Sequence, residues 1–219
     1  MIPSCPNWLR VALICLTVGS FLPQLHRIWA QKTGTGLSLL YILLNLINAT
    51  EQLTLAFFYT INVTWELDFF VNTPRSIGDW LNLAQLGVVW VLLFIFSLMH
   101  PDPQFPIPYR ILVAALYLVF GFISLFPVIT DALDSTLFHD PNEQSPGFGV
   151  NLFAGWNFFI VSPLTTLLSV CSIVPQAIQL RSQLSSPSPD QGMMRIQDCA
   201  LQGVVFGVLA ASWLFRVKI

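Results

Sequence analysis

Long apolar windows alternate along the chain with short polar segments. Each window reaches the roughly 20 residues that an α-helix needs to cross a hydrocarbon core about 30 Å thick. The segments between them are rich in proline, glycine, asparagine and charged residues, which is typical of loops. The pattern therefore predicts six membrane-spanning helices, over residues 8–29, 37–61, 77–99, 111–129, 150–180 and 196–217.

Composition supports this interpretation. The chain is 55% hydrophobic and 9% charged, whereas soluble domains carry roughly a quarter charged residues. We therefore expect an all-α transmembrane protein in a lipid bilayer. The net charge of -2 and the lack of a basic segment argue against a nucleic-acid partner.

Basic residues between the spans predict the orientation. One side of the membrane receives five of the nine Lys and Arg residues: Arg27, Lys32, Arg110, Arg181 and Arg195. Because cytosolic loops carry the excess of Lys and Arg, this side is expected to be cytosolic and the N-terminus lumenal or extracellular. Asn62-Val63-Thr64 would then be either a lumenal glycosylation acceptor or a chance match to its pattern.

Two segments of the chain repeat each other. LTVGSFLPQ at residues 16–24 is identical to LSVCSIVPQ at residues 168–176 in five of nine positions. Three spans separate the two copies, so both copies must cross the membrane in the same direction. We expect a first three-helix repeat over residues 1–100, a linker helix with its loops over 101–149, and a second repeat over 150–219. The second repeat has only two visible helices, so the expected seventh span is missing.

Each copy ends in a Pro-Gln pair: Pro23 with Gln24, and Pro175 with Gln176. A proline inside a helix cannot donate to the carbonyl four residues earlier, so each helix is expected to gain a bend and an unsatisfied acceptor. Such an acceptor is not tolerated against lipid, which predicts a buried or hydrated setting. Two matching bends would let the two halves rock around a shared interior.

Polar residues also fall on helical stripes. The fifth span carries Ser162, Thr165, Ser169, Ser172, Gln176 and Gln179, the second Tyr41, Asn45, Asn48 and Gln52, the first Thr17, Ser20, Gln24 and Arg27, and the third Asn82 and Gln85. Such residues can line a binding site or hold helices together. Our candidates for contact with a solute are Asn45, Asn48, Gln52, Asn82, Gln85 and Ser172.

Glu51 is the acidic residue nearest the middle of a predicted span. A charge buried there is costly, so the residue must pair, face water or hold a proton. Two interpretations are open, namely a carboxylate that couples protons or a cation to transport, and a structural partner of a nearby amide.

Other chemistry finds little support in the sequence. The four cysteines and three histidines show no spacing typical of a metal site or a disulfide framework. Nucleophile elbows and phosphate-binding glycine loops are also absent. We expect no cofactor, no metal and no catalytic residues.

The stretch PQLHRIWAQKTGTGLSLLYILL, from Pro23, resembles the PQ-loop repeat family. That family includes cystinosin, lysosomal exporters of cationic amino acids, SWEET sugar carriers and a factor for the use of dolichol-linked sugars. The resemblance implies a SWEET-like fold of parallel three-helix repeats and a transporter in a vacuolar, lysosomal or other endomembrane. The segment RSQLSSPSPDQ departs from the TGTGLS turn, and the second and sixth spans lack the prolines of the sugar carriers.

Two classes of function follow. The favoured one is a transporter that moves a small polar solute by alternating access, an amino acid rather than a sugar, with protons as a second partner. The alternative is a non-transporting membrane enzyme or assembly factor that acts on lipid-linked or hydrophobic substrates. The missing helix favours the alternative, or a homo-oligomer or partner subunit that completes the bundle.

Overall fold

The computed structural model describes residues 6–31, 38–63, 71–72, 74–99, 106–133, 148–184 and 189–213. Nearly all of these residues are helical, apart from short stretches such as 74–76 before α3, and none of them is in a strand. The elements are α1 (Asn7–Gln31), α2 (Leu39–Phe57), the π-helix η1 (Phe58–Asn62), α3 (Ile77–Met99), α4 (Ile107–Leu133), α5 (Phe148–Trp156), the π-helix η2 (Asn157–Val161), α6 (Ser162–Cys171), α7 (Ile173–Leu184) and α8 (Pro189–Trp213).

Among the described residues, five helical segments are long and apolar enough to cross a membrane: Asn7–Ala30, Leu39–Asn62, Ile77–Met99, Ile107–Leu133 and Leu152–Ser182. The chain is therefore a multi-pass membrane protein. In α8 the apolar part found among the described residues is shorter, Ala200–Ser212. The sixth span stays a prediction.

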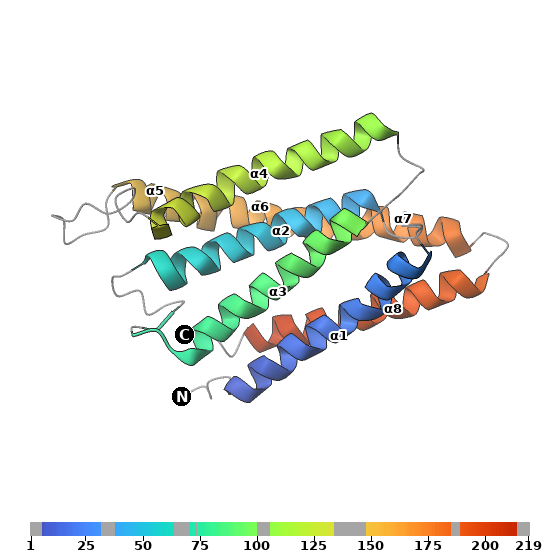
Figure 1. The fold of residues 1–219 in the computed structure, drawn as a ribbon, viewed down its shortest axis with the longest axis horizontal. Coiled ribbons are helices and arrows are strands. Elements are labelled where there is room, and N and C mark those ends of the chain that lie inside the picture. Colours follow the sequence, from blue (N-terminus) through green and yellow to red (C-terminus); the bar gives the residue numbers. More distant parts are fainter. Residues whose placement is uncertain are drawn as a thin grey trace.

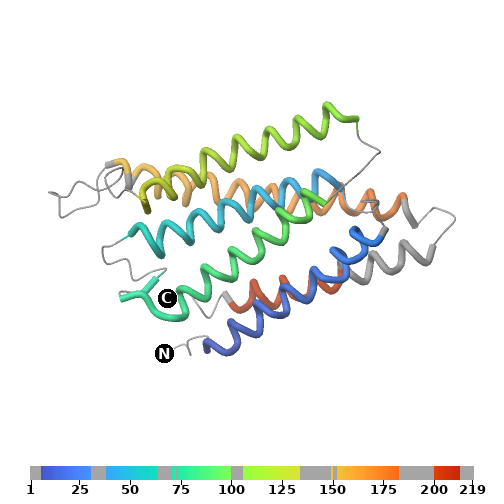
Figure 2. Tube along the Cα trace, viewed as in Figure 1, coloured from blue at the N-terminus to red at the C-terminus, as the bar shows by residue number. Residues whose placement is uncertain are grey.

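The helices lie side by side in one bundle (Figure 1). Helix α3 packs against both α1 and α2, while α2 also contacts α4, α6 and α7, and α8 contacts α1 and α7. The tube in Figure 2 shows that α1, α3 and the α5–α7 segment run in one direction and α2, α4 and α8 in the other. Helix α2 therefore has α3, α4 and the α6–α7 segment as neighbours.

Short polar contacts fix the ends of two spans. Ser76 and Asp79 form a capping box at the start of α3: the Ser76 N–H donates to Asp79 Oδ2 (2.8 Å), and the Asp79 N–H donates to Ser76 Oγ (3.3 Å). Arg75 donates from Nε to the Thr60 carbonyl (3.1 Å) and from Nη2 to the Val63 carbonyl. It thereby satisfies carbonyls left without a partner where η1 ends.

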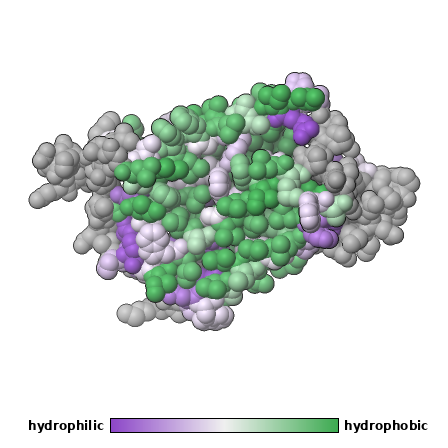
Figure 3. Space-filling model, viewed as in Figure 1, coloured by the Kyte–Doolittle hydropathy of each residue, from purple (hydrophilic) through white to green (hydrophobic). Residues whose placement is uncertain are grey.

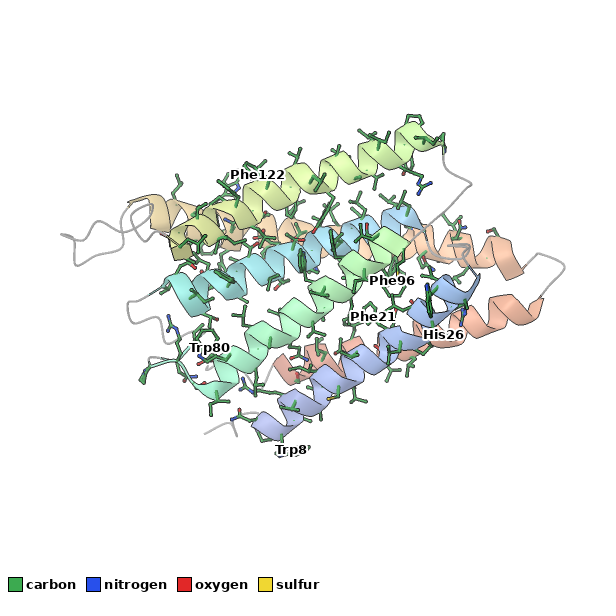
Figure 4. All side chains as sticks on the ribbon, in the orientation of Figure 1. Trp8, Phe21, His26, Trp80, Phe96 and Phe122 are labelled. Carbon is green, nitrogen blue, oxygen red and sulfur yellow. The ribbon has the colours of Figure 1, made fainter. Side chains whose placement is uncertain are left out.

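Two apolar clusters hold α1, α2, α3 and α4 together. Phe21 of α1 and Phe96 of α3 pack with ring centroids 5.3 Å apart, and Figure 4 shows both side chains in the space between their helices. Ile28, Ile42 and Leu92 complete this cluster. A second cluster joins α2 to α4 and consists of Leu39, Leu43, Leu46, Val113 and Tyr117.

The outward faces are apolar. On α4, large hydrophobic side chains such as Leu118 and Phe122 are more than half exposed, and so are Leu167 and Ile173 on the α6–α7 segment. Figure 3 shows hydrophobic residues over the middle of the molecule and hydrophilic residues toward its two ends. This distribution fits a protein surrounded by lipid along its length.

Candidate functional site

Polar side chains of α2 meet polar side chains of α6 along the contact between the two helices, where most of them are half-buried. Asn45 donates from Nδ2 to Ser172 Oγ (2.8 Å) and accepts at Oδ1 from Ser169 Oγ (2.8 Å). A further Asn45 hydrogen bond goes to the Tyr41 carbonyl (2.8 Å). The amide of Asn45 thus bridges two hydroxyls more than 120 residues away in the sequence.

The same contact extends in both directions along α2. Toward the C-terminal end of α2, Gln52 Nε2 donates to Ser162 Oγ (3.3 Å). Thr166 Oγ1 donates to the Ser162 carbonyl (2.8 Å) and lies 3.4 Å from Asn48 Oδ1. At the other end, the backbone N–H of Ser38 donates to Gln176 Oε1 (2.9 Å). We call this row the seam; it comprises Ser38, Asn45, Asn48, Gln52, Ser162, Thr166, Ser169, Ser172 and Gln176.

The seam joins most of the residues that the sequence predicts for a solute site, namely Asn45, Asn48, Gln52 and Ser172. It also contains Thr166, which the sequence analysis missed in favour of its neighbour Thr165. Thr165 is buried and donates to the carbonyl of Ser162 (3.1 Å), in its own segment. Thr166 also donates to that carbonyl (2.8 Å), so the two neighbours differ in that Thr166 is exposed and lies near Asn48. Adjacent residues point about 100° apart on a helix, which separates their surroundings.

The fifth span is irregular where it meets the seam. Its helix changes from α6 to α7 at Ser172, three residues before Pro175. Pro175 cannot donate to the Cys171 carbonyl, and the Ser172 hydroxyl donates to the Ser169 carbonyl (2.6 Å). Pro23, by contrast, lies inside the continuous helix α1, and Gln24, the counterpart of Gln176, is buried there.

Two predicted solute residues on α3 have other surroundings. Asn82 accepts a hydrogen bond at Oδ1 from Arg10 Nη1 (2.9 Å), which also donates to the Gly78 carbonyl (2.6 Å). A Cβ at Gly78 would lie 2.7 Å from this Nη1, so glycine gives the guanidinium its place. Asn82 therefore helps to hold α1 against α3. Gln85 is completely buried on α3.

Glu51 is fully buried in α2, and neither of its carboxyl oxygens has a hydrogen-bond partner among the described residues. The hydroxyl of Ser124, a buried residue of α4, is the side-chain group that stands next to the carboxyl group. Ser124 stands close without completing a hydrogen bond. Glu51 thus lies beside α4, although Gln52 next to it in the sequence belongs to the seam.

Helix α4 makes two further polar contacts, one with α2 and α3 and one with η1. Trp90 Nε1 of α3 donates to both Thr50 Oγ1 (3.0 Å) and the Tyr117 hydroxyl (3.2 Å), and these two oxygens lie 3.3 Å apart. Near the other end of α4, Asn62 Nδ2 donates to Asp131 Oδ2 (2.5 Å) and to the Val128 carbonyl (2.9 Å). Thr50, Tyr117, Asn62 and Asp131 are buried, and Trp90 is half-buried.

Within the described part of the chain, no three His, Cys, Asp or Glu side chains gather as they would around a metal ion. The arrangement instead offers neutral hydrogen-bonding groups and one isolated carboxyl group. The neutral groups can bind a polar solute through hydrogen bonds, and the carboxyl group can take up and release a proton.

Comparison with known proteins adds one finding. Residues 6–63 match the family of the PQ loop repeat, so the segment that contains α1, α2 and η1 is similar to that repeat. The curated proteins contain no match to the chain, and neither do the solved structures.

Proposed function

We propose that this membrane protein is a PQ-loop carrier that moves a small polar solute by alternating access. The seam is the observation that carries the proposal. Its bonds join α2 to the α6–α7 segment, and four of its five contacts run from one neutral side chain to another. A solute with amide, amino or hydroxyl groups can replace such bonds one for one.

The strength of the seam suits a contact that opens and closes. Hydrogen bonds between helices in a membrane contribute about 0.6 kcal/mol each on average, and so the five contacts sum to a few kcal/mol. A bound solute can supply that amount. An amino acid is the favoured class over a sugar, because α2 lacks the proline that sugar carriers place there.

The packing of the helices supports two half-bundles. Helix α3 lies against α1 and α2, as the middle member of a first three-helix unit. If the copies at residues 16–24 and 168–176 are equivalent, exchanging the halves turns the α2–α6 contact into the α8–α1 contact, and both exist. We propose that α8 is the sixth span and that Pro23 and Pro175 are the hinge positions.

Two finer features belong to the same proposal. Glu51, isolated in the middle of α2, exchanges a proton during the cycle. The membrane is a vacuolar, lysosomal or other endomembrane, with the N-terminus in the lumen, and the proton gradient across such a membrane would drive the solute.

Counterflow in proteoliposomes tests the proposal. Vesicles preloaded with a panel of unlabelled amino acids or sugars should accumulate the same labelled compound for at least one member of the panel. Asn45→Leu should reduce this uptake at least tenfold, because it removes both hydroxyl contacts of the amide. Thr130→Val is the matched control, since Thr130 donates only to carbonyls of its own helix, at 2.8 and 2.9 Å.

Uptake that is absent for the whole panel, or that survives Asn45→Leu unchanged, would contradict the carrier. One observation favours a non-transporting membrane enzyme or assembly factor in that case: the seam groups already satisfy one another, as groups with a packing role do. Asn45→Leu would then lower thermal stability and leave no transport defect to measure.

A further inference from the structure

We propose that Glu51 and Ser124 form a proton-holding site between α2 and α4, separate from the seam, in which Ser124 is the positioning residue. The inference deepens the proposed function, since it names the place where the coupled proton resides and the helix that holds it. It assigns a role in transport to the linker helix α4.

The first step is the direction of the Glu51 side chain. Consecutive residues of a helix point about 100° apart, so Glu51 and Gln52 of α2 face different neighbours. Gln52 bonds to Ser162 on α6 (3.3 Å), whereas Glu51 stands beside Ser124 on α4. The carboxyl group therefore lies outside the row of bonds that we assign to the solute.

The second step is the supply of donors around the carboxyl group. The nearest hydroxyls on the adjoining turns of α2 are committed: Thr50 donates to the Leu46 carbonyl (2.8 Å) and Thr54 to the Thr50 carbonyl (2.9 Å). An ionised carboxylate accepts about four hydrogen bonds, and a protonated one needs only an acceptor for its single O–H. Among the described residues Ser124 is the one hydroxyl placed beside the carboxyl group, and the protonated form fits this site.

The third step is the absence of a counter-charge. The described Lys, Arg and His residues include none that pairs with Glu51. Other titratable groups on the elements packed against α2 are engaged elsewhere or lie at helix ends: Asp79 in the cap of α3, Tyr117 with Thr50 and Trp90, Asp131 with Asn62, Arg181 in the last turn of α7, Tyr59 in η1, Tyr109 and Arg110 in the first turn of α4, and Cys171, which is exposed.

The fourth step concerns Ser124 itself. Tyr117, Ser124 and Asp131 follow one another at seven-residue intervals, close to two turns of helix, and all three are buried. Hydrogen bonds anchor the first to Thr50 and Trp90 and the last to Asn62. Ser124 is thus held between two fixed points, next to Glu51.

The site gives a route to coupling through α2. A protonated Glu51 is neutral and can stay buried, whereas an ionised one needs water or a donor. Loss of the proton therefore favours a state in which water enters beside α2. The side of α2 that can open in this way is the seam. The seam lies on another side of the same helix, and so the state of Glu51 changes the energy of opening it.

Infrared spectroscopy of the whole protein in lipid bilayers tests the site without any solute. The wild type should show the C=O band of a buried carboxylic acid at neutral pH, and alkaline titration should remove it. Glu51→Gln should abolish this band. Ser124→Ala should keep it but shift its frequency and its titration midpoint, and Ser124→Thr should restore both. Ser20→Ala is the control, because that buried hydroxyl donates to the Thr17 carbonyl on α1 (2.8 Å).

A band that persists in Glu51→Gln, a wild type that lacks the band, or a band that Ser124→Ala leaves unchanged would overturn the inference. The readout is independent of transport. If the band behaves as expected and counterflow fails for every solute, the carrier is wrong and the proton site stands. Solute uptake with no Glu51 band would contradict the proton site alone.

Discussion

Helix α2 binds its neighbours in two different ways. Toward α6 and α7 it offers amides that meet single hydroxyls, as Asn45 meets Ser169 and Ser172. Toward α4 it offers an apolar cluster that includes Leu43, Leu46 and Val113. Two buried sets of hydrogen bonds add to this cluster, one at Thr50 and one at Asn62 in η1, where the same span ends. The first side relies on weak and replaceable bonds, and the second on packed side chains.

This difference indicates which helices move together. Packed apolar side chains and buried hydrogen bonds resist separation of the helices. If the helices part, each polar group that loses its partner inside the membrane costs free energy. Helices α2, α3 and α4 should therefore act as one unit, and the α6–α7 segment should be the part that moves away. On this prediction, α4 moves together with α2 and α3.

The largest effect on stability is expected from the contact between η1 and α4. Asn62→Leu removes the donor to both Asp131 and the Val128 carbonyl, and we expect it to lower the free energy of unfolding by about 2–3 kcal/mol. Thermal denaturation in detergent measures this. Asn157→Leu is the matched control, since Asn157 is equally buried and donates to one carbonyl, that of Phe153 (2.9 Å). Equal losses for the two variants would count against the comparison.

A smaller effect is expected in the middle of α4. Tyr117→Phe removes a hydroxyl that contacts Thr50 and Trp90, which should cost about 1–2 kcal/mol. Trp90→Phe disturbs the same network, so the double variant should lose less than the sum of the single losses. Additive losses in the same denaturation assay would show that the three groups do not act together.

The smallest effect is expected across the seam. A double-mutant cycle of Asn45→Ala and Ser172→Ala should give a coupling energy of about 0.6 kcal/mol. Calorimetry or denaturation of the four proteins in one detergent provides the value. A coupling as large as that between Tyr117 and Trp90 would mean that the seam is not the side that separates.

Much of the fold follows from the chain's apolar windows. The predicted spans at 77–99 and 150–180 correspond to α3 and to the Leu152–Ser182 segment. The predicted fourth span, 111–129, was too short by one turn at each end, since α4 is Ile107–Leu133. Hydropathy marks the apolar centre, and the ends depend on caps and on Pro106, which accepts the first hydrogen bonds of α4 from Tyr109 and Arg110.

The site could be predicted only in part. Periodicity placed Asn45, Asn48 and Gln52 on one side of α2, where the structure has them. It could not assign Asn82, because its partner Arg10 is 72 residues away and stands outside the predicted stripe of the first span. The sequence marked Glu51 as the acidic residue nearest the middle of a span, but its neighbour Ser124 became visible only once α4 was placed. The spacing of Tyr117, Ser124 and Asp131 was the overlooked signal.

The burial of Asn62 also bears on how the chain matures. Its amide nitrogen, to which an oligosaccharide would be attached, donates to two groups of α4 and is enclosed by the bundle. A sugar at Asn62 and a seated α4 therefore exclude each other. This end of α2 lies in the lumen in the proposed orientation. A molecule that carries the sugar would therefore be one in which glycosylation took place before α4 packed against Asn62.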